Sequence, residues 1–141
     1  MIPDMGGKPQ YYRLIGQTPV PCTVEEWATN FSREDRRVLL TRIGPFEVST
    51  VFLGLNHNFW DEGPPILFET LTFLDAPEGG NFVADARARD FEGNNLMDGR
   101  DSTWLDAEAR HRRAVAWMQE HYCAATEQPL EIIDATTAKE G

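Results

Sequence analysis

The run Arg37-Val38-Leu39-Leu40-Thr41-Arg42-Ile43-Gly44-Pro45-Phe46-Glu47-Val48-Ser49-Thr50-Val51-Phe52-Leu53 decides the fold of this chain. Its two halves, residues 37–43 and 46–53, are rich in β-branched and apolar side chains, which favour strands. Only Gly44 and Pro45 separate the halves, which is typical of a tight hairpin. We therefore expect two adjacent antiparallel strands here.

Further strands are predicted on both sides of this hairpin. Residues 11–15 form an earlier β-prone run, and residues 18–21 follow as an extended connection because each proline biases its predecessor away from helix. Residues 66–73 form the next apolar strand. Residues 82–91 favour an edge strand that returns along it, and residues 130–133 allow a short last strand.

The first predicted helix covers residues 24–33. Thr23 stands three residues before Glu26, the pattern of a capping box in which hydroxyl and carboxylate each satisfy a free backbone amide. Apolar residues then recur at helical spacing and form a single face. They are Val24, Trp27, Ala28 and Phe31.

The second predicted helix begins after Ser102 or Thr103, either of which can cap it. Asp106 lies in its first turn, where the helix dipole favours an acid. Pro129 stops any continuation. The apolar stripe of this helix consists of Trp104, Ala107, His111, Val115, Met118 and Tyr122.

Together these elements predict an α+β fold, with an antiparallel meander sheet of about four to five strands and two amphipathic helices packed on one face. Trp27 and Trp104 would lead the two helices onto that face. We expect a flexible leader at residues 1–10, a single domain at 11–134 and a frayed tail at 135–141.

The chain is acidic, with 13 Lys and Arg against 23 Asp and Glu among 141 residues, a formal charge of −10. The first 50 residues are neutral, so the excess of acids lies in the rest. Duplex nucleic acids and anionic membranes are bound by clustered Lys and Arg side chains. Because this chain has an excess of acids, both are disfavoured as partners. A solvated acidic surface is the simpler interpretation. An acidic mimic of nucleic acid is the alternative, if the later acids line one surface.

Neither the composition nor the chain start indicates a membrane or secreted protein. No run approaches the roughly 18 apolar residues of a membrane-spanning helix, and the first residues lack the pattern of a signal peptide. We therefore expect a cytoplasmic protein. Cys22 and Cys123 form no disulfide framework, so two free thiols are expected, and no Cys/His spacing indicates zinc.

The segment between the strands at 46–53 and 66–73 is the strongest candidate site. It gathers His57, Phe59, Trp60, Asp61 and Glu62 on a loop longer than a hairpin needs. Loops held by a rigid sheet often carry function, and these residues suit a binding role. His57 could act as a general base oriented by Asp61 or Glu62. The alternative is a structural loop in which Phe59 and Trp60 fold back onto the core.

Glu69 is a further candidate, because it shares an alternation phase with Leu67, Leu71 and Phe73. In that phase its carboxylate would face the core and would need a partner, for which Arg13, Arg37, Arg42 and His111 are available. In the opposite phase Ile66 and Phe68 point inward and Glu69 lies in water. His57, Glu69 and His111 could also form a two-histidine, one-carboxylate metal site, though their separation in sequence favours no metal.

Other chemistry is not indicated. The chain has no phosphate-binding glycine loop, nucleophile elbow, His-Glu-x-x-His helix or dinucleotide fingerprint, so no cofactor is predicted. Arg110, Arg112 and Arg113 could grip an acidic partner. Acids are interleaved with these arginines, however, which favours a solvated helix face.

Several short runs together resemble a family of small proteins encoded in phage, prophage and bacterial genomes, without assigned function. The resemblance covers residues 11–74 and about 102–115, while the leader, residues 75–101 and the tail depart from it. It implies an accessory phage protein and carries over no catalytic residue. The runs are Tyr11-Tyr12-Arg13-Leu14, Gly16-x-Thr18-Pro19-Val20-Pro21, Glu26-Trp27, residues 48–55, His57-x-Phe59, Gly63-Pro64-Pro65, Leu67-Phe68-Glu69-Thr70 and Trp104-x-x-Ala107-Glu108-Ala109-x-His111.

The sequence therefore favours a non-enzymatic accessory module that binds a protein partner or associates with itself. Two alternatives stay open. One is a small hydrolase-like enzyme that uses His57 with Asp61 or Glu62. The other is the acidic mimic, which would block a DNA-binding partner.

Overall fold

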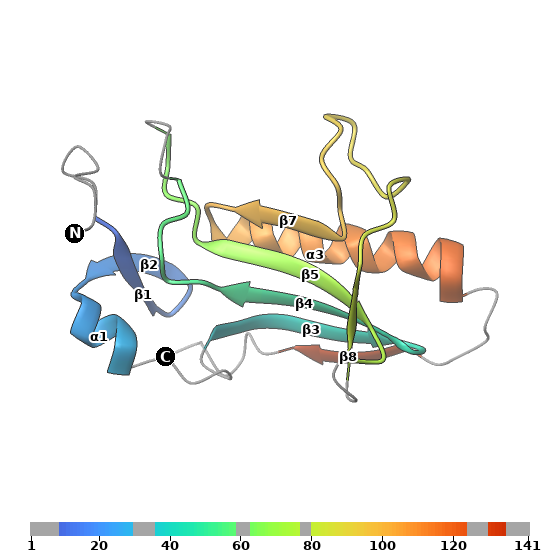
Figure 1. The fold of residues 1–141 in the computed structure, drawn as a ribbon, viewed down its shortest axis with the longest axis horizontal. Helices are drawn as coiled ribbons and strands as arrows, with labels where there is room; N and C mark the ends of the chain where they lie inside the picture. The colour runs from blue at the N-terminus through green and yellow to red at the C-terminus, as the bar shows by residue number, and fades with distance from the viewer. Residues whose placement is uncertain (1–8, 30–35, 59–62, 77–79, 124–129, 135–141) are drawn as a thin grey trace.

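The structure is a computed structural model that describes residues 9–29, 36–58, 63–76, 80–123 and 130–134. It is an α+β fold with antiparallel sheets, as predicted (Figure 1). The elements in chain order are β1 (Tyr11–Ile15), β2 (Thr18–Cys22), α1 (Val24–Thr29), β3 (Arg37–Ile43), β4 (Phe46–Phe52), β5 (Phe68–Leu74), β6 (Asn81–Val83), β7 (Asp98–Asp101), α3 (Trp104–Met118), the π-helical turn Gln119–Cys123 and β8 (Leu130–Asp134).

The main sheet grows from the predicted hairpin. β3 and β4 pair antiparallel around Gly44 and Pro45, and Gly44 has φ +57°, a backbone conformation that glycine adopts without strain. β5 and β6 continue the meander beyond β4, and β8 adds to the other side of β3, giving the strand order β6-β5-β4-β3-β8. The sixth strand, β7, pairs with the part of β5 that β6 does not reach.

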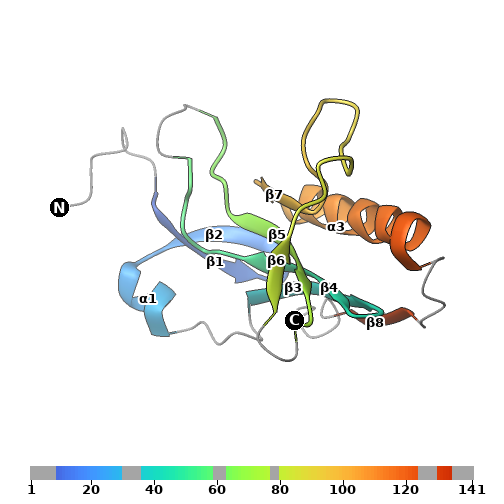
Figure 2. The ribbon, with the colours of Figure 1, turned by 45° about the vertical axis from the view of Figure 1, so that its right-hand side comes forward.

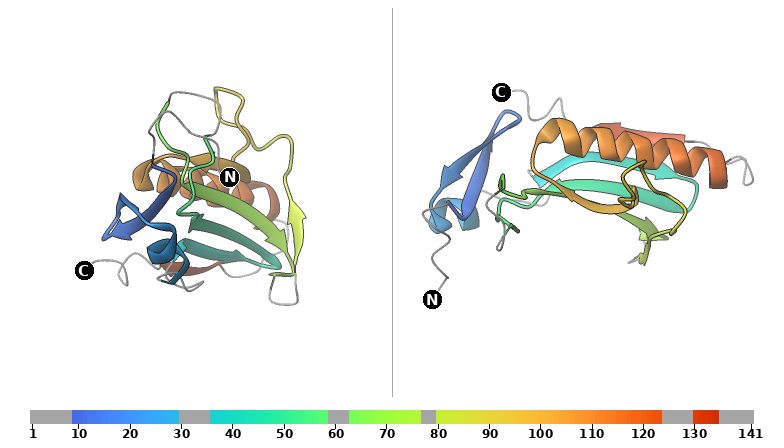
Figure 3. Two further views of the ribbon diagram at one scale, coloured as in Figure 1. Left: turned by 60° about the vertical axis from the view of Figure 1, so that its left-hand side comes forward. Right: turned by 90° about the horizontal axis from the view of Figure 1, so that it is seen from above.

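Helix α3 covers one face of this sheet, which we call the inner face (Figure 3). Its cap is Thr103, whose side chain accepts a hydrogen bond from the Asp106 amide, as the sequence predicts. The predicted stripe is buried against the strands, with Trp104 beside Phe68 and Phe52, and Met118 at the far end. Full burial of a Val or Met side chain, such as Val115 or Met118, stabilises a fold by roughly 1.5–3 kcal/mol.

A smaller unit formed by β1, β2 and α1 lies at one end of the sheet (Figure 1). The extended connection predicted at 18–21 is in fact β2, which pairs with β1 in a two-stranded sheet. Trp27 fastens the unit, because its ring lies 5.4 Å from that of Tyr11 and its Nε1 donates to the carbonyl of Leu53. The predicted capping box at Thr23 and Glu26 is present, with both hydrogen bonds at 3.1 Å.

The predicted packing of two helices on one face is not confirmed. α1 contacts β1 rather than the main sheet, and Figure 3 shows it beside the small hairpin while α3 runs along the sheet. None of its residues is buried, and Val24 is exposed. The physical reason is that the short β1–β2 hairpin offers little apolar surface. Phe31 and the rest of the helix predicted at 30–33 lie outside the described residues, as do leader residues 1–8 and the tail 135–141.

The predicted edge strand at 82–91 is mostly wrong. Of these residues only Phe82 and Val83, in β6, pair with β5; residues 84–97 leave the sheet, and the chain returns to β5 as β7. We call residues 84–97 the arm, and Figures 1 and 2 show it projecting away from the sheet. The chain turns around Gly93, and Asp98 and Gly99 belong to β7. Among the described helices, none is long and apolar enough to cross a bilayer.

Candidate functional site

The inner face holds a buried polar network around His111, which is 1% exposed. Its Nε2 shares a hydrogen bond of 2.9 Å with the Thr41 hydroxyl, and its Nδ1 shares one of 2.8 Å with Thr50. Thr50 in turn lies 2.7 Å from the Thr70 hydroxyl. Both ring nitrogens thus have partners within the core, so His111 serves the fold and reaches neither substrate nor metal.

Glu69 lies on the opposite face, so the prediction that it faces the core is wrong. Phe68, Thr70 and Thr72 are the buried residues of β5, and Glu69 forms an ion pair of 3.0 Å with Arg100 of β7. The alternative phase with Phe68 inward is confirmed. Because the inner face carries threonines, hydrophobicity alone did not distinguish the two faces of this strand.

The metal site considered for His57, Glu69 and His111 does not form. His111 and Glu69 point to different faces of the sheet, and the part of the chain that the structure describes has no group of three or more potential ligands positioned for a metal ion. Cys22 is a free thiol whose pKa is raised, mainly by burial.

The loop predicted as a site is described only at its two ends. His57 donates from Nδ1 to the carbonyl of Leu55 at 2.8 Å. The base of the loop is held by Asn56, whose side chain accepts from the amides of Asn58 and Ile66. Phe59, Trp60, Asp61 and Glu62 lie outside the described residues, so their predicted roles stay predictions.

Two arginines of α3, Arg112 and Arg110, lie in different environments. Arg112 pairs with Glu108 across one helical turn on the exposed side, as predicted. Arg110 does not lie on a solvated face: its side chain is 13% exposed and pairs with Asp101 at 2.8 Å. Gly99 makes room for it, since a Cβ there would collide with the guanidinium. Arg110 therefore ties the helix to β7.

The face of the sheet opposite α3, which we call the outer face, carries rows of side chains from adjacent strands. One row joins Arg37, Val51 and Glu69, and Arg100 extends it on β7. Because strand side chains alternate, the inward positions of Thr50 and Thr70 put every second neighbour outward. Another row consists of Arg42, Glu47, Phe73 and Phe82.

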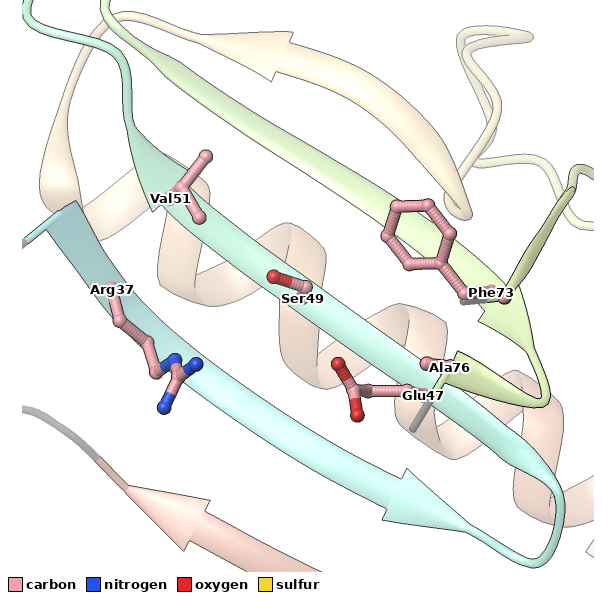
Figure 4. Close-up of a pocket in the computed structure, with 7 residues that line it drawn as sticks. Arg37, Glu47, Ser49, Val51, Phe73 and Ala76 are labelled. Carbon is pink, nitrogen blue, oxygen red and sulfur yellow. The ribbon is translucent and has the colours of Figure 1, made fainter. Parts of the chain in front are cut away.

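Between these rows lies a hollow of about 360 Å³, the outer hollow. Figure 4 shows it on the side of the sheet away from α3. Val51 and Phe73 give it apolar walls, while Ser49 and Glu47 add polar ones. Its lining residues are Arg37, Glu47, Ser49, Val51, Phe73, Ala76 and Gly80.

The charges in the outer hollow are unbalanced. Glu47 is paired with Arg42 at 3.4 Å. Arg37, by contrast, is half-buried and makes no hydrogen bond or ion pair with the residues that the structure describes. A guanidinium without a partner favours an incoming anion. Within the described part of the chain, the hollow therefore combines one unpaired cation with an apolar wall.

Among the residues that the structure describes, no histidine lines the outer hollow, and the Ser49 hydroxyl makes no hydrogen bond to a base. The sequence alone does not predict Ser49, Val51 or Phe73 as site residues. Their signal was alternation along β4 and β5, which becomes legible only once the inward phase is known.

Comparison with other proteins adds nothing to this geometry. The resemblance to phage-encoded proteins stays a prediction, and so does the cytoplasmic location. No protein-family model, curated protein or solved structure matches this chain.

Proposed function

We propose that this chain is a non-enzymatic protein-binding module whose outer hollow receives an aromatic side chain flanked by a carboxylate. The observation that carries this proposal is Arg37, a half-buried residue whose guanidinium has no partner among the described residues, beside the apolar Val51 and Phe73. An aromatic ring would pack on the apolar wall, and a carboxylate would accept charge-assisted hydrogen bonds from Arg37.

The size of the hollow supports a side-chain anchor rather than a whole small molecule. Its volume of about 360 Å³ lies at the lower end of the range for ligand pockets. Interfaces commonly depend on one or two aromatic anchors that fill such pockets, with polar contacts around them. An accessory role in a phage or prophage remains part of the proposal, on the sequence motifs alone.

The two alternatives have less support. Five carboxylates of the described residues form ion pairs with arginines, which weighs against a surface of free, phosphate-like charges. The enzyme hypothesis depends on His57 with Asp61 or Glu62, and neither carboxylate is among the described residues.

The test is a titration of the labelled protein with a capped Asp-Phe-Glu tripeptide, followed by amide chemical shifts. We expect saturable shifts centred on Ser49, Val51 and Phe73. Arg37→Ala should weaken binding at least about tenfold, since it removes a charge-assisted contact. A capped Asp-Ala-Glu tripeptide should bind far more weakly, because it lacks the ring.

The matched control is Arg112→Ala, which removes an exposed arginine from α3 and should leave the affinity unchanged. Absence of saturable shifts in the outer hollow, or equal affinity for the protein with and without Arg37, would overturn the proposal.

A further inference from the structure

The tip of the arm carries an aromatic side chain that is exposed to solvent. Phe91 is 93% exposed, the largest exposed fraction among the large hydrophobic residues that the structure describes. A phenyl ring in water gains nothing for the fold, so at the tip of an arm it is available to pack on a partner surface.

The arm is held firmly enough to present this ring. Tyr122 donates to Asp85 at 2.7 Å, and Arg87 binds the same carboxylate through two nitrogens at 2.8 and 3.1 Å. Across the arm, the Leu96 amide donates to Ala88, and both residues are buried in the core. These contacts anchor the base of the arm through both its outgoing and its returning segment.

The tip of the arm is ordered by its own hydrogen bonds. The Asp90 carboxylate accepts from the backbone amides of Glu92 and Asn94, each at 2.9 Å. These amides, that of Asn94 above all, lower the pKa of Asp90 and keep it charged. Phe91 thus stands between two acids on a preformed turn, which reduces the entropy lost on binding.

The tip matches the chemistry that the outer hollow requires. Phe91 is the aromatic anchor, and Glu92 is a carboxylate whose side chain makes no hydrogen bond or ion pair within the described residues. Arg37 is the corresponding free cation. The arm projects away from the sheet in Figures 1 and 2, so a hollow that accepts it belongs to another copy.

We propose that the partner of the outer hollow is a second copy of this chain, whose arm inserts Phe91 against Val51 and Phe73 and brings Glu92 to Arg37. This inference rests on the proposed function and names its occupant. Because one copy gives the arm and the other gives the hollow, the contact is head-to-tail, and it builds a closed ring or an open chain of copies. A single anchor buries little area, so the affinity is expected in the micromolar range or weaker.

The test uses sedimentation velocity of the full chain at increasing concentration. The wild-type protein should show a sedimentation coefficient that rises with concentration. Phe91→Ala, which removes the anchor, and Arg37→Glu, which repels Glu92, should each weaken association at least about thirtyfold. Val51→Glu is a second hollow variant in case Arg37→Glu does not fold.

The decisive sample is an equal mixture of the two variants. Phe91→Ala keeps an intact hollow and Arg37→Glu keeps an intact arm, so together they should form a one-to-one pair that grows no further. Leu105→Ala is the matched control, because it removes a hydrophobic side chain that is 75% exposed on α3 and should associate like wild type. Wild-type protein that stays monomeric, or a mixture that does not pair, would overturn this inference.

The two proposals fail separately. If the Asp-Phe-Glu peptide binds the outer hollow while the full chain stays monomeric, the hollow is a binding site whose partner is another protein, and only the self-association is wrong. If the peptide does not bind and association depends on neither Phe91 nor Arg37, both proposals are wrong.

Discussion

Thr50 joins the His111 network to β5, because its hydroxyl lies within hydrogen-bond distance of both the His111 ring and the Thr70 hydroxyl. Thr50→Val keeps the shape of the side chain but removes the hydrogen bonds that the hydroxyl shares with His111 and Thr70, two buried polar residues. We expect a loss of about 1–3 kcal/mol in the free energy of unfolding. Urea unfolding measures it, with Ser49→Ala on the outer face as a control that should change the free energy by less than about 0.5 kcal/mol.

The wrong placement of Glu69 on the core face is explained by the same buried threonines. A strand whose inner face carries threonines and whose outer face carries Leu71 and Phe73 has no clear hydrophobic side. The inward face of β5 carries Thr70, which bonds to Thr50 of β4, and Thr50 in turn bonds to His111 of α3, far along the chain. Local alternation therefore predicted that residues 66–73 form a strand, but could not assign Glu69 to a face.

At the scale of elements, the attachment of the β1–β2–α1 unit depends on Gly54. This glycine has φ +70°, and a Cβ there would meet Trp27 Nε1 at 2.6 Å and the Tyr12 carbonyl at 3.0 Å. Gly54→Ala should therefore displace Trp27 and loosen the unit. Gly93→Ala is the matched control, because Gly93 also has positive φ but has open space around it.

We expect Gly93→Ala to cost about 1–2 kcal/mol through its backbone alone. Gly54→Ala should cost at least about 1 kcal/mol more, since it adds a steric clash to the same backbone strain. Urea unfolding followed by tryptophan fluorescence gives both values. Equal losses for the two variants would show that Trp27 does not hold the unit in place.

The arm provides a pH-dependent prediction. Arg87, and then the Tyr122 hydroxyl, lower the pKa of Asp85 far below its usual range. A carboxyl whose pKa is depressed in the folded state adds stability above its unfolded pKa of about 3.9, and that stability is lost as the pH falls further. The urea concentration at the midpoint of unfolding should therefore decrease as the pH is lowered below about 4. In the Asp85→Asn protein this decrease should be smaller.

Trp117 reports on the same contact, because the Arg87 guanidinium lies 5.5 Å from its ring centroid. Its fluorescence should change in acid together with the unfolding midpoint in the wild-type protein. An Asp85→Asn protein with the same acid dependence as wild type would contradict the assignment of this stability to Asp85.

The existence of the elements was easier to predict than their places. The hairpin, the capping box at Thr23, the cap at Thr103 and the stripe of α3 depend on neighbouring residues, and periodicity and spacing reveal them. The position of α1 depends on Trp27 meeting Leu53 and Tyr11, and the arm depends on Asp85 meeting Tyr122 of the helix end. Such long-range contacts leave no local pattern in a single sequence.

At the scale of the whole molecule, one helix on a sheet produces two unlike faces. The inner face is buried under α3 and is rich in threonine and aromatic contacts. The outer face carries ion pairs around the outer hollow. The candidate site follows from this asymmetry, since α3 leaves the outer face to other contacts.

The most direct test of this account compares two adjacent residues of β4. Ser49→Cys and Thr50→Cys, each in a protein with Cys22→Ser and Cys123→Ser, place a single thiol on the outer and the inner face. We predict that a maleimide labels Cys at position 49 of the folded protein at least about a hundredfold faster than at position 50, whose reaction needs local opening. Equal rates, or faster labelling at position 50, would contradict the open outer face and the hollow on it.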